Sequence, residues 1–321
     1  MKKSSLYRRK IITRKWSDIQ RRKDCIITLG NFDGVHLGHR NIMSTLMDYS
    51  EKTGLEPLAV TFFPHPRLFF KKEKEFELLT APWEKEFLLT VDHSPRTYFI
   101  SFDRGFSKLG PDEFVHLFLI KRMRARIIVL GPDYRFGAGA GGDLRFLGQH
   151  LDSLGAKLIV VPSVKSNRKI ISSSLIRSYL NRGQINRANA MLGYNFFYSG
   201  TVVKGDNRGG KLGFPTANVE THCKQKLQVA AGVYGAYAIL GRKRLPALVN
   251  VGTNPTFKSQ KTKIEAHILD FRRNIYGQNI TLELNSYFRK EKKFKSDKEL
   301  VRQIRRDINK FKMQTEVKEK E

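Results

Sequence analysis

The sequence is poor in cysteine, in acidic residues and in long apolar runs, and each shortage excludes a class of protein. The two cysteines, Cys25 and Cys223, lie far apart without a metal-binding spacing, so we expect both to be reduced and structural. No apolar run reaches the roughly 20 residues that cross a bilayer, and the basic N-terminus lacks the apolar segment of a signal peptide. The sequence therefore indicates a cytoplasmic protein with no membrane contact.

The charge balance is extreme, with 59 Lys and Arg against 30 Asp and Glu and a net charge of +29. Such a field attracts polyanions, which include nucleic acids, anionic lipids and nucleotides. The sequence carries neither a zinc-finger spacing nor an aromatic RNA-binding signature. We interpret the excess as solvated basic faces, with phosphate ligands as a secondary reason, and we disfavour a dedicated nucleic-acid role.

The densest motif lies at residues 30–39, directly after the short apolar run Cys25–Leu29. The order of apolar run, glycine-rich turn and amphipathic stretch predicts a strand, a turn and then a helix from about Arg40. Backbone N–H groups at a helix start favour an anion, and glycines let a phosphate approach the backbone closely. The glycines and histidines that we expect around the phosphates are Gly30, Gly34, Gly38, His36 and His39. The alternative is a structural corner with two surface histidines.

Strand-like and helix-like segments alternate through the first half of the chain. The predicted strands are Cys25–Leu29, Pro57–Phe63, Thr97–Phe102, Ile127–Leu130 and Lys157–Val161. The predicted helices between them include Arg40–Lys52, Ser107–Arg122 and Asp143–Leu154. This alternation favours a doubly wound parallel sheet, in which ligands bind beyond the carboxyl ends of the strands.

Later segments of this half carry further polar side chains that could face the ligand. His65 lies between two prolines after the second predicted strand, and Asp133 lies in the glycine-rich loop after the fourth. Ser173 and Ser174 begin a predicted helix, and Arg177 lies one turn further on, within reach of the same anion. Taken alone, these segments would be an ordinary loop histidine and an ordinary capped helix.

The character of the sequence changes after a predicted helical linker at 183–194. Several short β-rich runs separated by turn residues predict a small antiparallel barrel. These runs are Phe196–Val203, Gly232–Leu240, Leu245–Val251, Lys263–Leu269 and Asn279–Phe288. Apolar residues at helical spacing within Asp297–Phe311 then predict a helix that packs on the barrel.

A second dense motif spans residues 203–218. Its glycines and basic residues can surround phosphates, although their order is not that of a Walker loop. The Thr216 hydroxyl and the Asn218 amide oxygen are suitable magnesium ligands. Further along, Glu265 shares one face of a predicted strand with His267, where a carboxylate is either a capped polar group or a general base.

The motifs of the first half resemble those of the bacterial bifunctional riboflavin kinase/FAD synthetase family. Residues 30–39 are similar to its nucleotide-binding signature, which carries His-x-Gly-His. Three later family segments correspond to residues 61–66, 131–137 and 172–177. The chain has Asp133 where the family has Asn or Asp, and an ionised Asp can only accept a hydrogen bond where an Asn could also donate one. It departs from the family pattern at Ser174, where the family has Thr.

The motifs of the second half resemble the riboflavin kinase part of the same family. Residues 213–218 match its Gly-Phe-Pro-Thr-Ala-Asn motif in full, and residues 250–257 and 264–271 match two further segments. The resemblance extends from about Ile26 to Phe311, with both sets of motifs in the order of the family.

The resemblance implies a nucleotidyltransferase-type doubly wound parallel sheet domain followed by a small antiparallel Greek-key β-barrel domain with a C-terminal helix. It implies that the chain phosphorylates riboflavin to FMN with ATP and then adenylylates FMN to FAD with a second ATP, releasing pyrophosphate. The implied partners are these small molecules, with Mg²⁺ as cofactor. The implied domains are 1–185 for adenylyl transfer, a linker at 186–194, 195–312 for the kinase and a tail at 313–321.

The resemblance also implies roles for single residues. Glu265 would deprotonate the ribityl hydroxyl, and His36 and His39 would stabilise charge on the triphosphate during adenylyl transfer. The implied binding residues of the first domain are Gly30, Phe32, Asp33, Gly34, Gly38, His65, Asp133, Ser173, Ser174 and Arg177. Those of the second are Gly205, Gly210, Lys211, Gly213, Pro215, Asn254 and Arg289, with Thr216 and Asn218 on the metal.

Two alternatives stay open at the level of the sequence. One is a monofunctional member of the family with one inactive site. The other is a basic nucleic-acid-binding or flavin-binding protein on the same scaffold, motivated by the net charge of +29. The presence of Thr216, Asn218 and Glu265 argues against the second, since a binding protein has no need of a base. The sequence does not define an oligomeric state.

Overall fold

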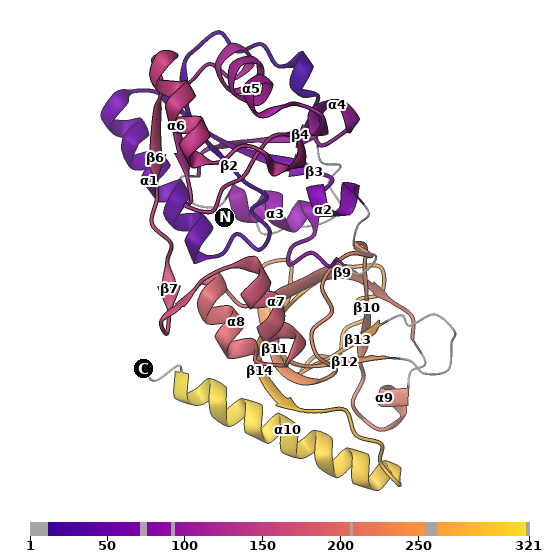
Figure 1. Cartoon of the computed structure of the whole chain (residues 1–321). Coiled ribbons are helices and arrows are strands. Elements are labelled where there is room, and N and C mark those ends of the chain that lie inside the picture. The colour runs from indigo at the N-terminus through magenta and orange to yellow at the C-terminus, as the bar shows by residue number, and fades with distance from the viewer. Residues whose placement is uncertain (1–11, 71–75, 91–93, 206–207, 254–261, 319–321) are drawn as a thin grey trace. The chain divides into compact units, whose positions relative to one another are not determined.

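The computed structural model describes residues 12–70, 76–90, 94–205, 208–253 and 262–318 (Figure 1). The side chains of Arg208, Lys211, Thr253, Thr262 and residues 315–318 lie outside this description. Contacts within the chain define two compact units, one over Lys10–Ser173 and the other from Ser174 onward. Within the described residues, no helix is long and apolar enough to cross a membrane.

The first unit is built on a parallel six-stranded sheet with the strand order β1-β4-β3-β2-β5-β6. The strands are β1 (Thr13–Arg14), β2 (Cys25–Leu29), β3 (Glu56–Phe63), β4 (Arg96–Ser101), β5 (Ala125–Leu130) and β6 (Lys157–Val160). All five residues of β2 are buried, as expected for a central strand covered on both faces. The chain runs from β2 to β3 and β4 on one side, then crosses to β5 and β6 on the other. The predicted doubly wound parallel sheet is confirmed.

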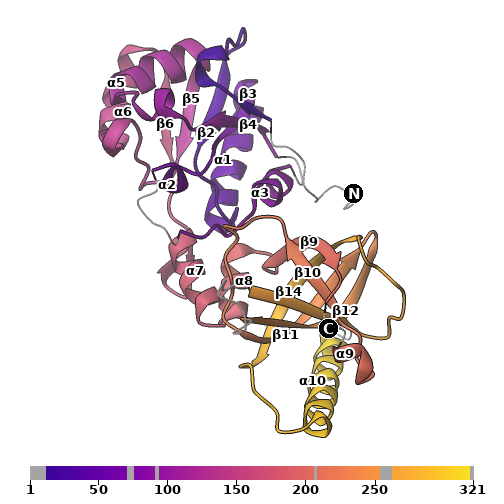
Figure 2. The ribbon, with the colours of Figure 1, turned by 90° about the vertical axis from the view of Figure 1, so that its right-hand side faces the viewer.

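Helices cover both faces of this sheet (Figure 2). α1 (Leu37–Thr53) and α3 (Pro82–Leu89) pack on one face, and η3 (Phe114–Arg122) and α6 (Leu144–Ser153) pack on the other. α1 ends before Gly54, whose φ of 70° suits a glycine. The shorter elements are η2 (Trp16–Asp18), α2 (Pro66–Phe69), α4 (Arg104–Ser107), α5 (Pro111–Glu113), η4 (Ala138–Ala140), β7 (Lys165–Ser166) and β8 (Lys169–Ile170).

The second unit is a closed antiparallel barrel with the strand order β10-β13-β12-β11-β14-β9. The strands are β9 (Phe197–Val203), β10 (Ala217–Thr221), β11 (Gly232–Leu240), β12 (Lys243–Thr253), β13 (Thr262–Ile268) and β14 (Asn279–Arg289). The helices are α7 (Ser173–Asn181), α8 (Ile185–Leu192), α9 (Arg208–Lys211) and α10 (Asp297–Lys318). The connections from β10 to β11 and from β13 to β14 each pass two intervening strands, as in a Greek key. The predicted barrel with a terminal helix is confirmed.

Two details of the barrel differ from the sequence-based list of elements. β10 was not predicted, because its first two residues end the glycine-rich motif and its last three were not assigned to any element. α10 extends beyond the predicted Phe311 to Lys318. Phe311 is fully buried against Leu248 and Leu269, so the apolar stripe of α10 packs on the barrel as expected.

Candidate functional sites

The loop from Gly30 to His36 leaves the carboxyl end of β2 at the centre of the parallel sheet. The glycine-rich loop 131–137 leaves the carboxyl end of β5, which pairs with β2. The winding of the chain reverses between these two strands, and open α/β sheets bind their ligands at such a switch point. The fold therefore brings two of the predicted phosphate-binding segments to its expected ligand site.

Asp33 braces this histidine loop (residues 30–39) from inside the protein. Its buried carboxylate accepts hydrogen bonds of 3.1 Å from the backbone N–H groups of Leu79 and Thr80 and from the Thr80 hydroxyl. The same hydroxyl accepts a hydrogen bond from the Gly34 N–H, also at 3.1 Å. The Ser173 hydroxyl donates to the Asp33 backbone carbonyl at 2.8 Å. Asp33 thus connects the loop both to the segment before α3 and to Ser173, the last residue of the first unit.

The two histidines form a stacked pair at the start of α1. The Nδ1 atom of His36 accepts a hydrogen bond from the His39 N–H at 3.3 Å, and the two ring centroids lie 3.6 Å apart. Burial, followed by repulsion from His36 and Lys85, lowers the pKa of His39 well below its usual 6.5. The His39 ring is therefore neutral at pH 7. Its Nδ1 atom is buried and has no hydrogen-bond partner among the described residues, which leaves it available to a ligand.

The glycines of the loop are required by the rings of the same motif. A Cβ atom at Gly30 would lie 2.7 Å from the Phe32 ring, and one at Gly38 would lie 3.2 Å from the His36 ring. Gly34 has a φ of 86°, which favours glycine. The Phe32 ring is buried and meets His39 edge to face at 5.3 Å. These predicted residues therefore shape the loop from within.

Sequence reasoning missed two residues that contact the histidine loop, Thr80 and Lys85. Both are buried, and the Lys85 ammonium donates to the Asn31 backbone carbonyl at 3.1 Å. The sequence signal here is Pro82, which is typical of the first turn of a helix, and α3 begins at this residue. That signal contains nothing about where the helix packs, so the contacts of α3 with the loop could not be derived from it.

The other predicted residues of the first site lie in different surroundings. His65 precedes α2, where its Nδ1 atom accepts a hydrogen bond from the Arg67 N–H at 3.2 Å. Asp133 is exposed in the loop after β5. Ser174 is exposed and Arg177 is half-buried in α7, and both belong to the second unit. The roles of these four residues at a phosphate stay predictions.

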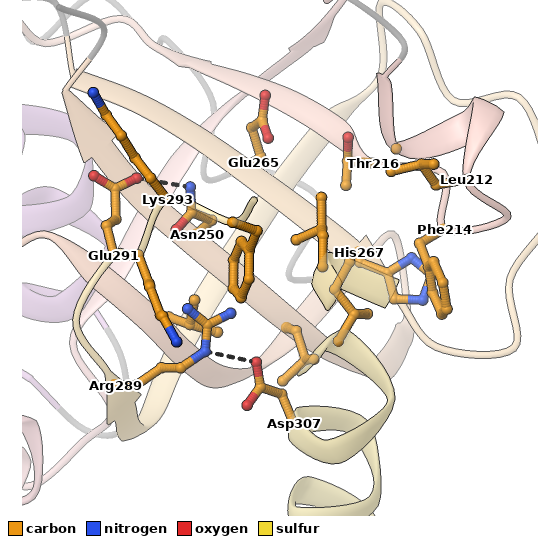
Figure 3. A pocket seen from close by; sticks show the side chains of 17 residues that line it. Leu212, Phe214, Thr216, Asn250, Glu265, His267, Arg289, Glu291, Lys293 and Asp307 are labelled. Atoms are coloured by element: carbon orange, nitrogen blue, oxygen red, sulfur yellow. Dashed lines mark hydrogen bonds and ion pairs between the residues drawn. The ribbon is translucent and has the colours of Figure 1, made fainter. Parts of the chain in front are cut away.

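The second unit contains a cavity of about 610 Å³. Its walls come from β12, β13 and β14, from the segment that follows β14, and from α10, which contributes Leu300 and Ile304. Figure 3 shows the Glu265 carboxylate and the Thr216 hydroxyl on one side of the cavity and the pair of Arg289 and Asp307 on the other. The cavity thus combines a polar region that carries a carboxylate with an apolar region.

Glu265 lies in β13 between two asparagines, with Asn218 of β10 and Asn250 of β12 opposite it in register. Its carboxylate forms a 2.8 Å ion pair with Lys263, and 27% of its side chain stays exposed, so a ligand can reach it. His267, two residues further along β13, contacts the Pro215 backbone carbonyl through Nδ1 at 2.9 Å. This contact joins the segment before β10 to β13 close to Glu265.

Asn218 is the clearest candidate for a metal ligand in the barrel. It is 8% exposed, and its Oδ1 atom is buried without a hydrogen-bond partner among the described residues. A side chain at Gly205 would collide with the Asn218 amide, so this position requires glycine. No group of three or more His, Cys, Asp or Glu in the described part of the chain could hold a metal. An amide oxygen and a hydroxyl oxygen suit Mg²⁺, which binds few protein ligands together with substrate phosphates.

Arg289 is part of the connection between the cavity wall and α10. Its Nε atom donates to the Asp307 carboxylate at 2.9 Å, and the Gln303 amide donates to the other carboxylate oxygen at the same distance. Across the cavity wall, the Asn250 amide donates to Glu291 at 3.1 Å (Figure 3). The end of β14 is therefore joined to α10 through Asp307, and the segment that follows β14 is joined to β12 through Asn250.

The remaining predicted residues of the second site are placed only in part. Gly210 lies in α9, and the exposed Gly213 has a φ of 85°. Pro215 is exposed and uses its carbonyl for His267. The side chain of Lys211 and the whole of Asn254 lie outside the described residues.

A histidine loop at the switch point of a parallel sheet, combined with a barrel cavity that carries a carboxylate, defines a transferase with two sites for phosphate ligands. The family model described as FAD synthetase matches residues 18–175, and the one described as riboflavin kinase matches residues 192–315. The bifunctional riboflavin kinase/FMN adenylyltransferase of Escherichia coli K12 is 35% identical over 88% of this chain and 90% of its own length. The Bacillus subtilis protein of the same name is 32% identical with the same coverage. The chain belongs to the bifunctional riboflavin kinase/FMN adenylyltransferase family.

A solved structure agrees with this assignment of the fold. The crystal structure titled as a macrolide-efflux protein from Streptococcus pneumoniae has a TM-score of 0.85 to this chain at 31% identity. The aligned region covers 92% of this chain and 96% of the solved chain, so the similarity includes both units.

Proposed function

We propose that the two reactions of the family are divided between the two units of this chain. The barrel phosphorylates riboflavin to FMN with ATP, and the parallel-sheet unit adenylylates FMN to FAD with a second ATP and releases pyrophosphate. One observation carries the proposal. Glu265 and Thr216 line the same cavity of the barrel, whereas the histidine loop belongs to the other unit. The enzyme is cytoplasmic, in keeping with its two buried thiols, Cys25 and Cys223, and its partners are its small-molecule substrates.

In the barrel, Glu265 is the general base. Its carboxylate takes the proton of the ribityl hydroxyl while that oxygen attacks the γ-phosphorus of ATP and the bond to ADP breaks. The ion pair with Lys263 at 2.8 Å holds the carboxylate in place before the substrate arrives. Leu300 and Ile304 of α10 supply an apolar wall against which a flavin ring can pack, and Arg289 lies beside it.

Thr216 and Asn218 would hold Mg²⁺ in this site through a hydroxyl and an amide oxygen. The bound ion would neutralise charge on the ATP phosphates. The buried, unpartnered Oδ1 atom of Asn218 supports this assignment, since such an atom is costly without a partner. Gly205 lets the Asn218 amide take this position, because a Cβ atom at residue 205 would collide with it.

In the parallel-sheet unit, a phosphate oxygen of FMN attacks the α-phosphorus of ATP and the bond to pyrophosphate breaks. The start of α1 supplies backbone N–H groups, and His36 and His39 supply ring nitrogens as charge builds on the phosphates. Because His39 is neutral at pH 7, it acts as a hydrogen-bond donor rather than as a cation.

The test is Glu265→Gln, with the two half-reactions measured separately from riboflavin and from supplied FMN. The substitution keeps the shape and removes the base, so FMN formation should fall about a hundred- to ten-thousand-fold while FAD formation from FMN persists. Glu283→Gln is the matched control. Like Glu265, Glu283 is a partly exposed carboxylate of the barrel in an ion pair, which it forms with Arg244 at 3.1 Å. Loss of both half-reactions in a folded Glu265→Gln protein would contradict the division of labour.

A further inference from the structure

Lys85 of α3 lies beneath the histidine loop and is 6% exposed. Its ammonium donates to the Asn31 carbonyl at 3.1 Å, to the Thr61 hydroxyl at 3.0 Å and to the Phe62 carbonyl at 3.4 Å. A lysine ammonium has three donors, and these acceptors use all of them. Asn31 follows β2, while Thr61 and Phe62 lie in β3, so one side chain joins the carboxyl ends of two neighbouring strands.

The charge of this ammonium also acts on His39. All three acceptors of Lys85 are neutral, and burial lowers its pKa from 10.5 to about 8, with Asp33 opposing the change. Lys85 is therefore a cation at neutral pH. Its charge adds to burial and to His36 in lowering the pKa of His39. The ionisable groups that act on Lys85 and His39 are thus Asp33 from the loop and His36 from the start of α1.

We propose that Lys85 is a positioning residue of the adenylyl-transfer site, which holds the histidine loop against β3 with its charge close to the His39 ring. The inference rests on the proposed function of that loop. Without the ammonium, the carbonyls of Asn31 and Phe62 lose their shared donor and the loop can move away from β3. A displacement of about 1 Å at reacting groups can lower a rate on the order of a hundredfold.

The main experiment uses Lys85→Met, which keeps the apolar stem and removes the ammonium. The kcat of FAD formation from supplied FMN should fall on the order of a hundredfold, while riboflavin phosphorylation by the same preparation stays unchanged. The titration of His39, followed by NMR without substrates, should move to higher pH because the repulsion from Lys85 is gone. A lysine whose charge does not act on the His39 ring would leave that titration where it is.

Two further variants make the test decisive. Lys226→Met is the matched control, because Lys226 is a 2% exposed lysine of the barrel whose ammonium lies 4.4 Å from the Phe196 ring. It should leave FAD formation unchanged. Lys85→Gln keeps two N–H donors and removes the charge, so it should shift the His39 titration as Lys85→Met does, with a smaller loss of kcat. If Lys85→Met does not fold, Lys85→Gln carries the test with the same two readouts.

A folded Lys85 variant with the kcat of the wild type, or with an unchanged His39 titration, would overturn the proposal. His39→Ala, assayed in parallel, separates this outcome from a failure of the proposed function. If His39→Ala lowers FAD formation and the Lys85 variants do not, only the role of Lys85 is wrong. If none of these variants affects FAD formation, the histidine loop is not the adenylyl-transfer site.

Discussion

At the scale of single residues, each motif contains residues that build it and residues that face its ligand. Asp33 belongs to the first kind, because its carboxylate is engaged by Leu79 and Thr80. His39 and Asn218 belong to the second, because each has a buried polar atom without a partner among the described residues. A buried polar atom that lacks a partner is costly, and these two lie within the motifs that we propose to bind phosphates and magnesium.

Thr80→Val tests the bracing of the histidine loop. The Thr80 hydroxyl donates to Asp33 and accepts from the Gly34 N–H, and valine keeps its shape without the oxygen. We expect the unfolding free energy of the first unit to fall by about 1–3 kcal/mol, since a buried N–H loses its partner. FAD formation should fall as well, while FMN formation is kept. Denaturant unfolding can be followed by tryptophan fluorescence, because Trp16 and Trp83 both lie in this unit.

The control for this prediction is Thr45→Val. The Thr45 hydroxyl donates only to the Asn41 carbonyl one turn earlier in α1, as far as the described residues show. Its removal should leave both stability and FAD formation close to the wild type. Equal effects of the two substitutions would mean that the Thr80 hydroxyl has no special role in the loop.

Lys85 makes the stability of the first unit depend on pH in a defined window. Its pKa is about 8 in the folded protein and 10.5 in the unfolded chain, so the unfolded chain binds more protons between these values. The contribution of this group to stability is complete above pH 10.5 and is lost as the pH falls through about 8. The unfolding free energy of wild type minus that of Lys85→Met should therefore increase from pH 8 to 10.5. A difference that is constant across this window would contradict the shift in pKa.

At the scale of elements, the sequence predicted those segments whose own pattern determines them. The buried run Cys25–Leu29 and the helix over residues 40–52 are present with small changes in their ends. β10 was missed because Ala217–Thr221 is short and becomes a strand only by pairing with β9 and β13. The contact of α3 with the histidine loop was missed for the same reason, since it depends on packing between distant segments.

Asp307→Asn tests how α10 is held at the cavity. The Asp307 carboxylate is 5% exposed and accepts hydrogen bonds from Arg289 and Gln303, so the amide leaves the Arg289 guanidinium without its counter-charge. Hydrogen bonds to charged groups contribute about 1.5–3 kcal/mol, and we expect riboflavin to bind about ten- to a hundredfold more weakly. Quenching of riboflavin fluorescence on titration with protein measures this affinity.

A second aspartate that pairs with α10 provides the control. Asp270 forms a 3.2 Å ion pair with Lys312, but 82% of its side chain is exposed, so the pair should contribute little. Asp270→Asn should bind riboflavin like the wild type. Unchanged binding in Asp307→Asn too would mean that the Arg289–Asp307 pair does not shape the flavin site.

At the scale of the whole molecule, the order of motifs along the chain indicated the family and its two sites, and the composition did not. Both sets of motifs appear in the family order, and the two family models match the segments that carry them. The net charge of +29 gave no information about either site. The division into units could be located only roughly from the sequence, because contacts divide the chain at Ser173 and Ser174, within a single helix.

If the two sites act independently, two variants that each lack one half-reaction should together carry out both when they are mixed. Glu265→Gln should lack FMN formation and keep FAD formation, and His39→Ala should show the opposite pattern. A mixture of the two variants with riboflavin and ATP should then make FAD, because FMN released by one chain can diffuse to the other. Chromatography of the products over time measures this, with each variant alone as the control. A mixture that makes no FAD, at FMN concentrations at which Glu265→Gln alone converts supplied FMN, would contradict two independent sites.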